Sequence, residues 1–330
     1  MTILVTGGGG FLGKAIVRRL LDRDEQVRSF SRGDYPVLRS WGVELHRGDL
    51  HDADAVSLAV KDCDLVFHVA AKPGIGVRYR DFFRANVVGT ENVLHACRRW
   101  HVPKLVYTSS PSVVFDGKDM AGVDESVPYP QHYEAHYPKT KAMAERLVLA
   151  ADSPELATMS LRPHLIWGPG DNHLIPRILQ RAKSGRLRQV GDGKNLIDTI
   201  YIDNAADAHL LAADKLHYGS SISGKAYFLS QGEPVLLWKL VNRILALAGV
   251  PAVTKRLSPT LAYAIGWVLE LGYGVLGRSD EPPMTRFLAR ELATSHWFNI
   301  DAARKELGYE PSVSMEEGLK RLGAALREEA

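Results

Sequence analysis

A run of glycines directly after a short apolar segment is the feature that most constrains the fold of this chain. Residues 3–5 (Ile-Leu-Val) predict a buried strand, residues 6–13 read Thr-Gly-Gly-Gly-Gly-Phe-Leu-Gly, and residues 14–21 have the periodicity of a helix. A glycine loop between a strand and a helix allows a tight turn, lets the backbone approach a pyrophosphate and places that anion at the helix N-terminus. The pattern therefore predicts a dinucleotide-binding loop, with a merely tight turn as the alternative. The residues expected to contact the cofactor here are Gly7, Gly10, Phe11, Leu12 and Gly13.

Short apolar runs alternate with longer helical patterns through the first half of the chain, which predicts a parallel sheet covered by helices. The expected fold is α/β, a Rossmann-type doubly wound parallel sheet followed by a smaller, mostly helical region. We divide the chain into a dinucleotide-binding domain at 1–165 and a mainly substrate-binding region at 166–330. One strand near 198–204 is expected to return to the first domain.

Composition argues against several classes of function. The 330 residues are 45% hydrophobic, so the chain can bury a large core, and a net charge of +3 argues against nucleic acid as a partner. The basic helix predicted over 176–188 is interleaved with apolar residues, as in an ordinary solvated helix face. Cys63 and Cys97 do not have metal-ligand spacing, and no metal site is predicted. The chain starts without the basic and apolar regions of a secretion signal, so we expect a cytoplasmic protein.

Tyr137 and Lys141 are four residues apart in a segment that predicts a helix, so their side chains share one face. An ammonium group beside a phenol favours the phenolate and lowers the phenol pKa toward the range where general acid–base catalysis is efficient. Ser110 follows a predicted strand at 104–107, where its hydroxyl can hydrogen-bond a substrate oxygen beside that phenol. A tyrosine and a lysine at this spacing also occur by chance. The pair gains weight only together with the glycine loop and the serine.

These motifs resemble those of the extended short-chain dehydrogenases/reductases, and the resemblance covers essentially the whole chain. The spacing of Gly7, Gly10 and Gly13 and the Tyr-x-x-x-Lys pair are typical of that family. Three later segments are similar to its 3β-hydroxysteroid dehydrogenase-like branch: Arg-Pro-His-Leu-Ile-Trp-Gly-Pro-Gly-Asp at 162–171, Glu-Pro-Pro-Met-Thr-Arg-Phe at 281–287 and Leu-Gly-Tyr-Glu-Pro at 307–311. Within this branch, the patterns are most similar to those of the bacterial 2-alkyl-3-oxoalkanoate reductases of long-chain olefin biosynthesis.

The resemblance implies an oxidoreductase that moves a hydride between nicotinamide C4 and a carbonyl carbon. Tyr137 would donate the proton, Lys141 would lower the phenol pKa and bind the nicotinamide ribose, and Ser110 would orient the oxygen. The expected reaction is NADPH-dependent reduction of the 3-keto group of a long-chain 2-alkyl-3-oxoalkanoate, with a 3β-hydroxysteroid or sterol dehydrogenase as the alternative. A nucleotide-sugar epimerase or dehydratase fits less well, because Ile197 stands where those enzymes carry an arginine. A non-catalytic NADP(H) sensor also fits less well, because such proteins commonly lose the Tyr–Lys pair.

The resemblance also implies contacts along the cofactor. Ser31 and Arg32 follow the second predicted strand, where NAD-specific relatives carry an acidic residue, so NADP(H) is expected to be preferred, with NAD(H) as the alternative. Asp49 and Leu50 are expected at the adenine, and Asn86 is expected to hold the active-site helix and a water. The remaining residues expected at the cofactor are Ala70, Ala71, Lys72, Thr108, Ser109, Pro163 and His164, together with Tyr137 and Lys141.

A lipid-like keto acid is the expected substrate. Residues 257–276 are apolar with little charge and would form an apolar wall of the substrate site or an interfacial patch, with an ordinary core as the alternative. Arg78 and Arg286 are candidates for pairing with the substrate carboxylate. The resemblance implies a homodimer, with the helix that begins at Asn86 along the interface. Peripheral contact with a membrane and association with other enzymes of the pathway are left open.

Overall fold

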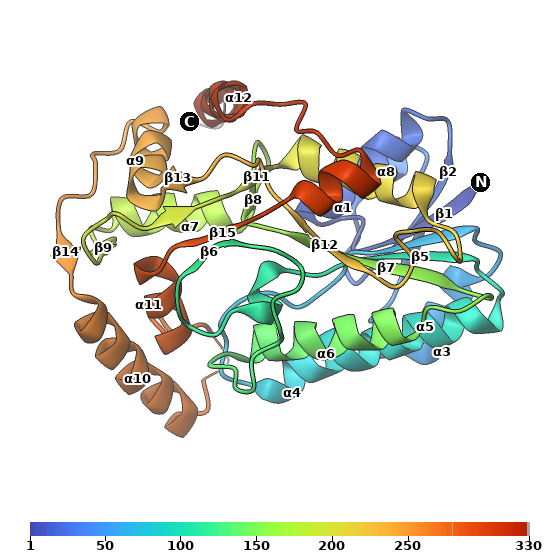
Figure 1. Cartoon of the computed structure of the whole chain (residues 1–330), viewed down its shortest axis with the longest axis horizontal. Helices are drawn as coiled ribbons and strands as arrows, with labels where there is room; N and C mark the ends of the chain where they lie inside the picture. Colours follow the sequence, from blue (N-terminus) through green and yellow to red (C-terminus); the bar gives the residue numbers. More distant parts are fainter. Residues whose placement is uncertain (279, 329–330) are drawn as a thin grey trace.

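The computed structural model describes residues 1–278 and 280–328. The strands of the main sheet are β1 (Thr2–Thr6), β2 (Gln26–Ser31), β3 (Glu44–Arg47), β4 (Leu65–His68), β5 (Lys104–Thr108), β7 (Ala157–Pro163) and β12 (Ala226–Leu229). They are all parallel and lie in the order β12-β7-β5-β4-β1-β2-β3 (Figure 1). The central strands are buried on both faces, which explains their nearly continuous apolar sequence. The prediction of a Rossmann-type sheet is confirmed.

Helices cover both faces of this sheet. Their bounds are α1 (Phe11–Leu21), α2 (Pro36–Ser40), α3 (Ala53–Val60), α4 (Tyr79–Phe82), the π-helical turn η1 (Phe83–Val88), α5 (Gly89–Arg99), the 3₁₀ turn η2 (Pro111–Val114), α6 (His136–Ala150) and α8 (Ile202–Lys215). Helices α3, α5 and α6 lie on one face, and α1 and α8 pack together on the other (Figure 1). Because α6 packs against β7 and α5, the sheet fixes the position of Tyr137 and Lys141 in its first turns.

The strand expected near 198–204 belongs to a different sheet from the one predicted. The structure has β11 (Ile200–Tyr201) there, and it pairs with β8 (Ile166–Trp167) in a separate two-stranded sheet. The chain then enters α8 at Ile202. The strand that returns to the main sheet is β12, which follows α8 in the chain and pairs with β7.

The C-terminal region is mostly helical, as predicted, and contains short strands. Its helices are α7 (Leu174–Lys183), α9 (Leu237–Leu247), α10 (Pro259–Val275), α11 (Arg286–Ala293) and α12 (Met315–Glu328), with the π-helical turn η3 (Ala303–Leu307). Its strands are β13 (Val235–Leu236), β10 (Leu196–Ile197), β15 (His296–Phe298) and β6 (Met120–Val123), which form one sheet in this order, and β9 (Gln189–Val190), which pairs with β14 (Arg256–Leu257). Helix α7 ends earlier than the helix predicted over 176–188. Since β6 comes from the first half of the chain, the two regions interleave.

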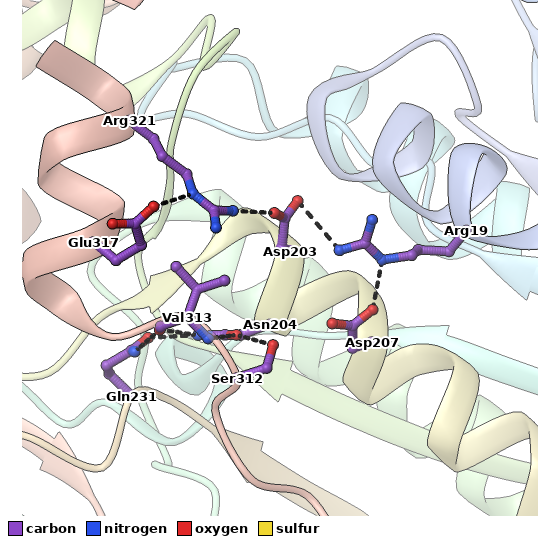
Figure 2. Close-up of polar contacts among 9 residues, drawn as sticks. All are labelled: Arg19, Asp203, Asn204, Asp207, Gln231, Ser312, Val313, Glu317 and Arg321. Atoms are coloured by element: carbon purple, nitrogen blue, oxygen red, sulfur yellow. Dashed lines mark hydrogen bonds and ion pairs between the residues drawn. The ribbon is translucent and has the colours of Figure 1, made fainter. Parts of the chain in front are cut away.

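Polar contacts connect the C-terminal segment, including α12, to helices α1 and α8 on the main sheet (Figure 2). Arg19 of α1 and Arg321 of α12 both pair with Asp203 of α8. The buried Asn204 side chain accepts the Val313 N–H at 2.9 Å and donates to the Val313 carbonyl oxygen at 2.8 Å. Helix α8 therefore connects the helix that follows the glycine loop with the end of the chain.

Helix α10 leaves most of its apolar side chains exposed. Gly266 is buried against the backbone of Thr285 and Arg286 at the start of α11, so α10 packs closely on α11 along one side. The exposed side chains, which we call the α10 apolar face, are Leu261, Ile265, Trp267, Val268, Leu271, Val275 and Leu276. An ordinary core therefore accounts only for the inner side of this segment. No helix within the described ranges is both long and apolar enough to cross a membrane.

Candidate active site

One cavity of about 640 Å³ lies where the strands of the main sheet end. Its wall includes residues that directly follow β1, β4, β5 and β7, which is where parallel sheets bind ligands. The predicted site residues that line it are Gly7, Gly10, Phe11, Leu12, Gly13, Ser31, Arg32, Asp49, Leu50, Ala70, Ala71, Lys72, Thr108, Ser109, Ser110, Tyr137, Lys141, Pro163 and His164. Segments far apart in the sequence thus meet around one volume.

The glycine loop fits an anion. Gly7 has a φ of +71°, and a Cβ there would lie 2.9 Å from the Ala70 Cα, so this close approach of two backbones requires glycine. A Cβ on Gly13 would lie 2.1 Å from the Gly7 carbonyl oxygen. No side chain caps α1, whose first residues Phe11 and Leu12 line the cavity. The backbone N–H groups of this turn can therefore bind a pyrophosphate, and the helix dipole favours its negative charge.

Two buried hydroxyls of the cavity wall, Ser31 Oγ and Ser109 Oγ, have no hydrogen-bond partner among the described residues. Buried polar atoms are normally hydrogen-bonded, so both fit a polar ligand such as a dinucleotide. Arg47 of β3 lies beside Ser31 in the sheet and donates its Nε–H to the Arg32 carbonyl oxygen at 2.9 Å. Ser31 and Arg47 also line a second cavity of about 170 Å³. Sequence reasoning missed Arg47, because strand neighbours are known only once the sheet order is known.

Ser110 and Tyr137 lie together in the main cavity. Ser110 caps the turn η2, where its Oγ accepts the Ser112 N–H at 3.2 Å. Burial raises the pKa of Tyr137 to about 12, and a hydrogen bond with Ser110 acts in the opposite direction. A phenol with this pKa is protonated at neutral pH. That is the form that donates a proton to a developing alkoxide.

Lys141 is hydrogen-bonded to the end of β5. Its Nζ donates to the Thr108 carbonyl oxygen at 2.5 Å and lies 4.1 Å from the centre of the Tyr107 ring. Burial lowers the pKa of Lys141 to about 7, against the opposing influence of the Glu145 carboxylate. The lowering of the Tyr137 pKa by Lys141 stays a prediction, because burial of the phenol dominates that pKa in the structure. Lys141 still lines the cavity.

Asn86, predicted at the cofactor, lies behind the cavity wall instead of lining it. Its Oδ1 accepts the Lys72 N–H at 2.7 Å, and its Nδ2 donates to the Lys72 carbonyl oxygen at 3.2 Å and to Thr140 Oγ1 at 3.0 Å. These bonds tie the segment after β4 to α6. The predicted structural role of Asn86 therefore agrees with the geometry, and direct contact with the cofactor does not.

A buried ion pair anchors α6 to β7. Arg162 Nη2 donates to Glu145 Oε1 at 2.7 Å, and both side chains are almost fully buried. The Ser160 and Tyr129 hydroxyls also donate to the Glu145 carboxylate, each at 2.7 Å. Burial alone would raise the pKa of Glu145, but the Arg162 guanidinium and these hydrogen bonds lower it. Glu145 thus holds the helix that carries two of the three predicted catalytic residues, Tyr137 and Lys141.

The ring of His164 borders the cavity, but both of its nitrogens have protein partners. Nδ1 lies 2.5 Å from Asp198 Oδ1, and Nε2 lies 3.2 Å from His296 Nδ1. His296 Nε2 donates to the Glu291 carbonyl oxygen at 2.8 Å. The sequence predicts His164 at the cofactor, whereas this geometry favours a histidine whose ring nitrogens bond to its own protein surroundings. Within the part of the chain that the structure describes, no cluster of three or more His, Cys, Asp or Glu is arranged for a metal ion.

Helix α11 completes the cavity with two residues that sequence reasoning missed. Phe287 and Glu291 are four residues apart, so they share a helix face, and both line the wall. The Phe287 ring packs edge-on against Phe115, with ring centroids 5.8 Å apart. The segment 281–287 carries a family-like pattern, but a pattern of this kind does not say which helix face meets the cavity.

The residues expected to surround the substrate lie elsewhere. Arg286 Nε pairs with Glu270 Oε2 at 2.7 Å, and Arg78 donates to the Gly277 carbonyl oxygen at 2.7 Å. Neither arginine lines the cavity, and residues 257–276 contribute nothing to the wall that the structure describes. The prediction of an apolar wall from this segment is therefore wrong. The physical reason is that α10 packs on α11, and α11 provides the wall.

Residues 4–258 match the 3-beta hydroxysteroid dehydrogenase/isomerase family. The chain belongs to this family. A 2-alkyl-3-oxoalkanoate reductase of Stenotrophomonas maltophilia is 52% identical over 98% of this chain and 99% of its own length, and one of Shewanella oneidensis is 48% identical over 98% and 85%. The decarboxylating sterol-4-alpha-carboxylate 3-dehydrogenase of Mus musculus is 34% identical over 96% and 88%.

Solved structures show the same fold over the whole chain. The crystal structure of gox2253 has 28% sequence identity and a TM-score of 0.81, with 100% of this chain and 98% of the other covered. MoeE5 in complex with UDP-glucose and NAD has 25% identity and a TM-score of 0.76, with 100% and 99% covered. This member of the 3-beta hydroxysteroid dehydrogenase/isomerase family is therefore an NAD(P)-dependent oxidoreductase.

Proposed function

We propose that this protein reduces the 3-keto group of a long-chain 2-alkyl-3-oxoalkanoate to the 2-alkyl-3-hydroxyalkanoate with NADPH. The observation that carries the proposal is the 52% identity, over nearly the full length, to a protein named 2-alkyl-3-oxoalkanoate reductase. The cavity supports it, because Tyr137, Ser110 and Lys141 share one volume with the glycine loop. A 3β-hydroxysteroid or sterol dehydrogenase remains the alternative, with the 34% identical mouse relative as its support.

The proposed mechanism assigns one task to each of three side chains. NADPH, when bound, supplies the hydride that reaches the carbonyl carbon. Ser110 orients the carbonyl oxygen with a hydrogen bond, and Tyr137 gives its phenolic proton to that oxygen as negative charge develops. The raised pKa of Tyr137, about 12, keeps this proton in place at neutral pH. Lys141 of α6, whose ammonium lies at the end of β5, would hold the nicotinamide ribose.

A comparison of substrates tests this proposal. NADPH oxidation is followed with a 2-alkyl-3-oxo acid, a 3-ketosteroid and a UDP-4-keto sugar at equal concentrations. We expect kcat/KM for the keto acid to exceed the values for the other two substrates by at least about tenfold. A pocket that fits one of these substrates differs by several contacts from a pocket that fits another. A preference for the ketosteroid would replace the proposal by its alternative.

We propose that NADPH is preferred over NADH, because Ser31, Arg32 and Arg47 lie together at the ends of β2 and β3, and their side chains can bind a 2′-phosphate. In an Arg32→Ala variant, kcat/KM for NADPH should fall about tenfold or more, since a hydrogen bond to a charged group contributes about 1.5–3 kcal/mol. The value for NADH should change little. The control is Arg23→Ala, which removes an arginine that pairs with Asp214 away from the cavity. A wild-type protein that prefers NADH would contradict the proposal.

We propose that the α10 apolar face rests on a lipid surface. The face is exposed, with Val275 and Leu276 at 79% and 73%. Basic residues adjoin its N-terminal end, because β9 pairs with β14 and brings Arg188 near Lys255 and Arg256. Apolar side chains next to basic groups fit the interface of a membrane that contains anionic lipids. Such contact would suit an enzyme that takes a lipid-like substrate.

The double variant Leu271→Glu/Val275→Glu tests the membrane contact. We expect its binding to vesicles of mixed anionic and neutral phospholipids to weaken at least about tenfold, because each buried apolar side chain contributes about 1.5–3 kcal/mol. Turnover of a short-chain keto acid should stay the same. The matched control is Leu58→Glu, which changes a leucine that is 63% exposed on α3. Equal vesicle binding by all three proteins would refute the contact.

Three further expectations stay predictions of this proposal. A homodimer is expected along the helical segment that begins at Asn86 and continues into α5, and light scattering of the purified protein measures it. Association with other enzymes of the same pathway is tested by co-purification with them. A cytoplasmic location, with or without membrane contact, is tested by cell fractionation.

A further inference from the structure

The proposed substrate carries a carboxylate next to its reacting carbonyl, and the site must accommodate that charge. The cationic side chains of the cavity wall are Arg32, Lys72 and Lys141. Arg32 belongs to the adenosine end, and Lys141 is bound to the Thr108 carbonyl oxygen. Lys72 Nζ lies 5.4 Å from the centre of the Phe82 ring. Beside Tyr137 and Ser110, the wall offers an acidic residue instead of a basic one.

That residue is Glu291 of α11. Thr285 caps this helix by accepting the Leu288 N–H at 3.1 Å, which fixes where the helix starts. Phe287, one turn before Glu291, is held by its edge-on contact with Phe115. The helix thus presents Glu291 to the cavity on a rigid element.

The Glu291 carboxyl group makes no hydrogen bond or ion pair with any described residue, although its backbone carbonyl oxygen accepts from His296 Nε2. Burial raises the pKa of Glu291 to about 8. Glu291 and Tyr137 line the same cavity, and the contact of Phe287 with Phe115 brings α11 beside the turn that Ser110 caps. An acid that lines the cavity and has no partner among the described residues points to a ligand.

We propose that Glu291, as a neutral acid, binds the substrate by donating its O–H to the substrate carboxylate. Two carboxyl groups that face each other in a cavity cannot both be ionised cheaply, and they share one proton instead. An O–H donor to an ionised oxygen makes a short hydrogen bond that is roughly twice as strong as a neutral one. The inference rests on the proposed function, since it requires a substrate with a carboxylate beside the carbonyl. It gives the site a reason to select 3-oxo acids over simple ketones.

The test compares two substrates that differ only in the carboxylate. A 2-alkyl-3-hydroxy acid and the secondary alcohol that lacks its carboxyl group are oxidised with NADP⁺, which avoids the loss of CO₂ that 3-oxo acids undergo. The variants are Glu291→Leu, which cannot donate, and Glu291→Gln, whose amide N–H can. Fluorescence titration of NADPH checks that the variants still bind the cofactor.

We expect Glu291→Leu to raise KM for the hydroxy acid at least about tenfold and to change KM for the alcohol less than about twofold, because the lost bond is made only to the carboxylate. Glu291→Gln should remain within about threefold of wild type on both substrates. A structural role for Glu291 would affect the acid and the alcohol alike.

Three outcomes would overturn the inference and leave the proposed function intact. One is that Glu291→Leu raises KM for the hydroxy acid and KM for the alcohol equally, while the wild-type protein oxidises the acid. Another is a Glu291→Gln variant as impaired as Glu291→Leu, and a third is a selective loss of acid binding in Lys72→Met instead. A wild-type protein that acts on a 3β-hydroxysteroid and not on the hydroxy acid would overturn the proposed function, and the inference with it.

Discussion

Replacing Tyr137 by Phe should lower kcat for ketone reduction by about 10²–10⁴-fold, the contribution that a positioned general acid makes. The ring remains, so the packing of α6 changes little, but the oxygen on which negative charge develops loses its proton donor. NADPH should still bind, because the glycine loop and the adenosine end are unchanged. Single-turnover oxidation of NADPH measures the first effect, and fluorescence titration of NADPH measures the second.

Tyr133→Phe is the matched control for this result. It also removes one phenolic hydroxyl from the same part of the chain, but that hydroxyl donates to the Val113 carbonyl oxygen at 2.9 Å and does not line the cavity. The turnover of Tyr133→Phe should stay within about twofold of wild type, because the substitution lies outside the cavity wall. Near-normal turnover of Tyr137→Phe would show that another group donates the proton.

The largest expected effect on stability comes from Glu145→Gln. The change leaves the buried Arg162 guanidinium without a counter-charge, which costs about 3–5 kcal/mol in comparable pairs. The free energy of unfolding, measured by urea titration, should fall by that amount. Because the folded-state pKa of Glu145 lies below its ordinary value of 4.5, the stabilisation is present above that pH and is lost as the pH falls through the folded-state pKa. The difference between wild type and variant should therefore shrink in acid.

An exposed ion pair provides the contrast. Glu316 pairs with Arg243 on the surface, and its side chain is 74% exposed. Glu316→Gln should change the free energy of unfolding by no more than about 1 kcal/mol. If Glu145→Gln and Glu316→Gln lost the same small amount of stability, the buried pair would not anchor α6 in the way described above.

Much of the fold and of the cofactor site is predictable from the sequence because it rests on local patterns. The glycine loop needs only neighbouring residues to define a strand, a turn and a helix start. The four-residue spacing of Tyr137 and Lys141 places both on one face of α6 whatever the rest of the chain does. The other predicted residues lie near strand ends. Because parallel strands share their direction, these ends meet at one edge of the main sheet.

The parts that the sequence did not predict depend on contacts between distant segments. Glu291 and Phe287 line the cavity only because α11 packs beside it. Residues 257–276 have the composition of a core, but α11 takes the inner position and leaves α10 outside. The direction of the Lys141 ammonium depends on the carbonyl group at the end of β5, which spacing along α6 does not reveal.

The pairing of β6 with β15 has a consequence for how the protein is made. β6 is complete at residue 123, but its parallel partner begins at His296, so most of the C-terminal region must leave the ribosome before this pair can form. Until then, the backbone groups of β6 that later bond to β15 have no strand beside them, and an unpaired strand is a site where nascent chains associate wrongly. The β6–β15 pair can therefore form only after residue 298 has left the ribosome.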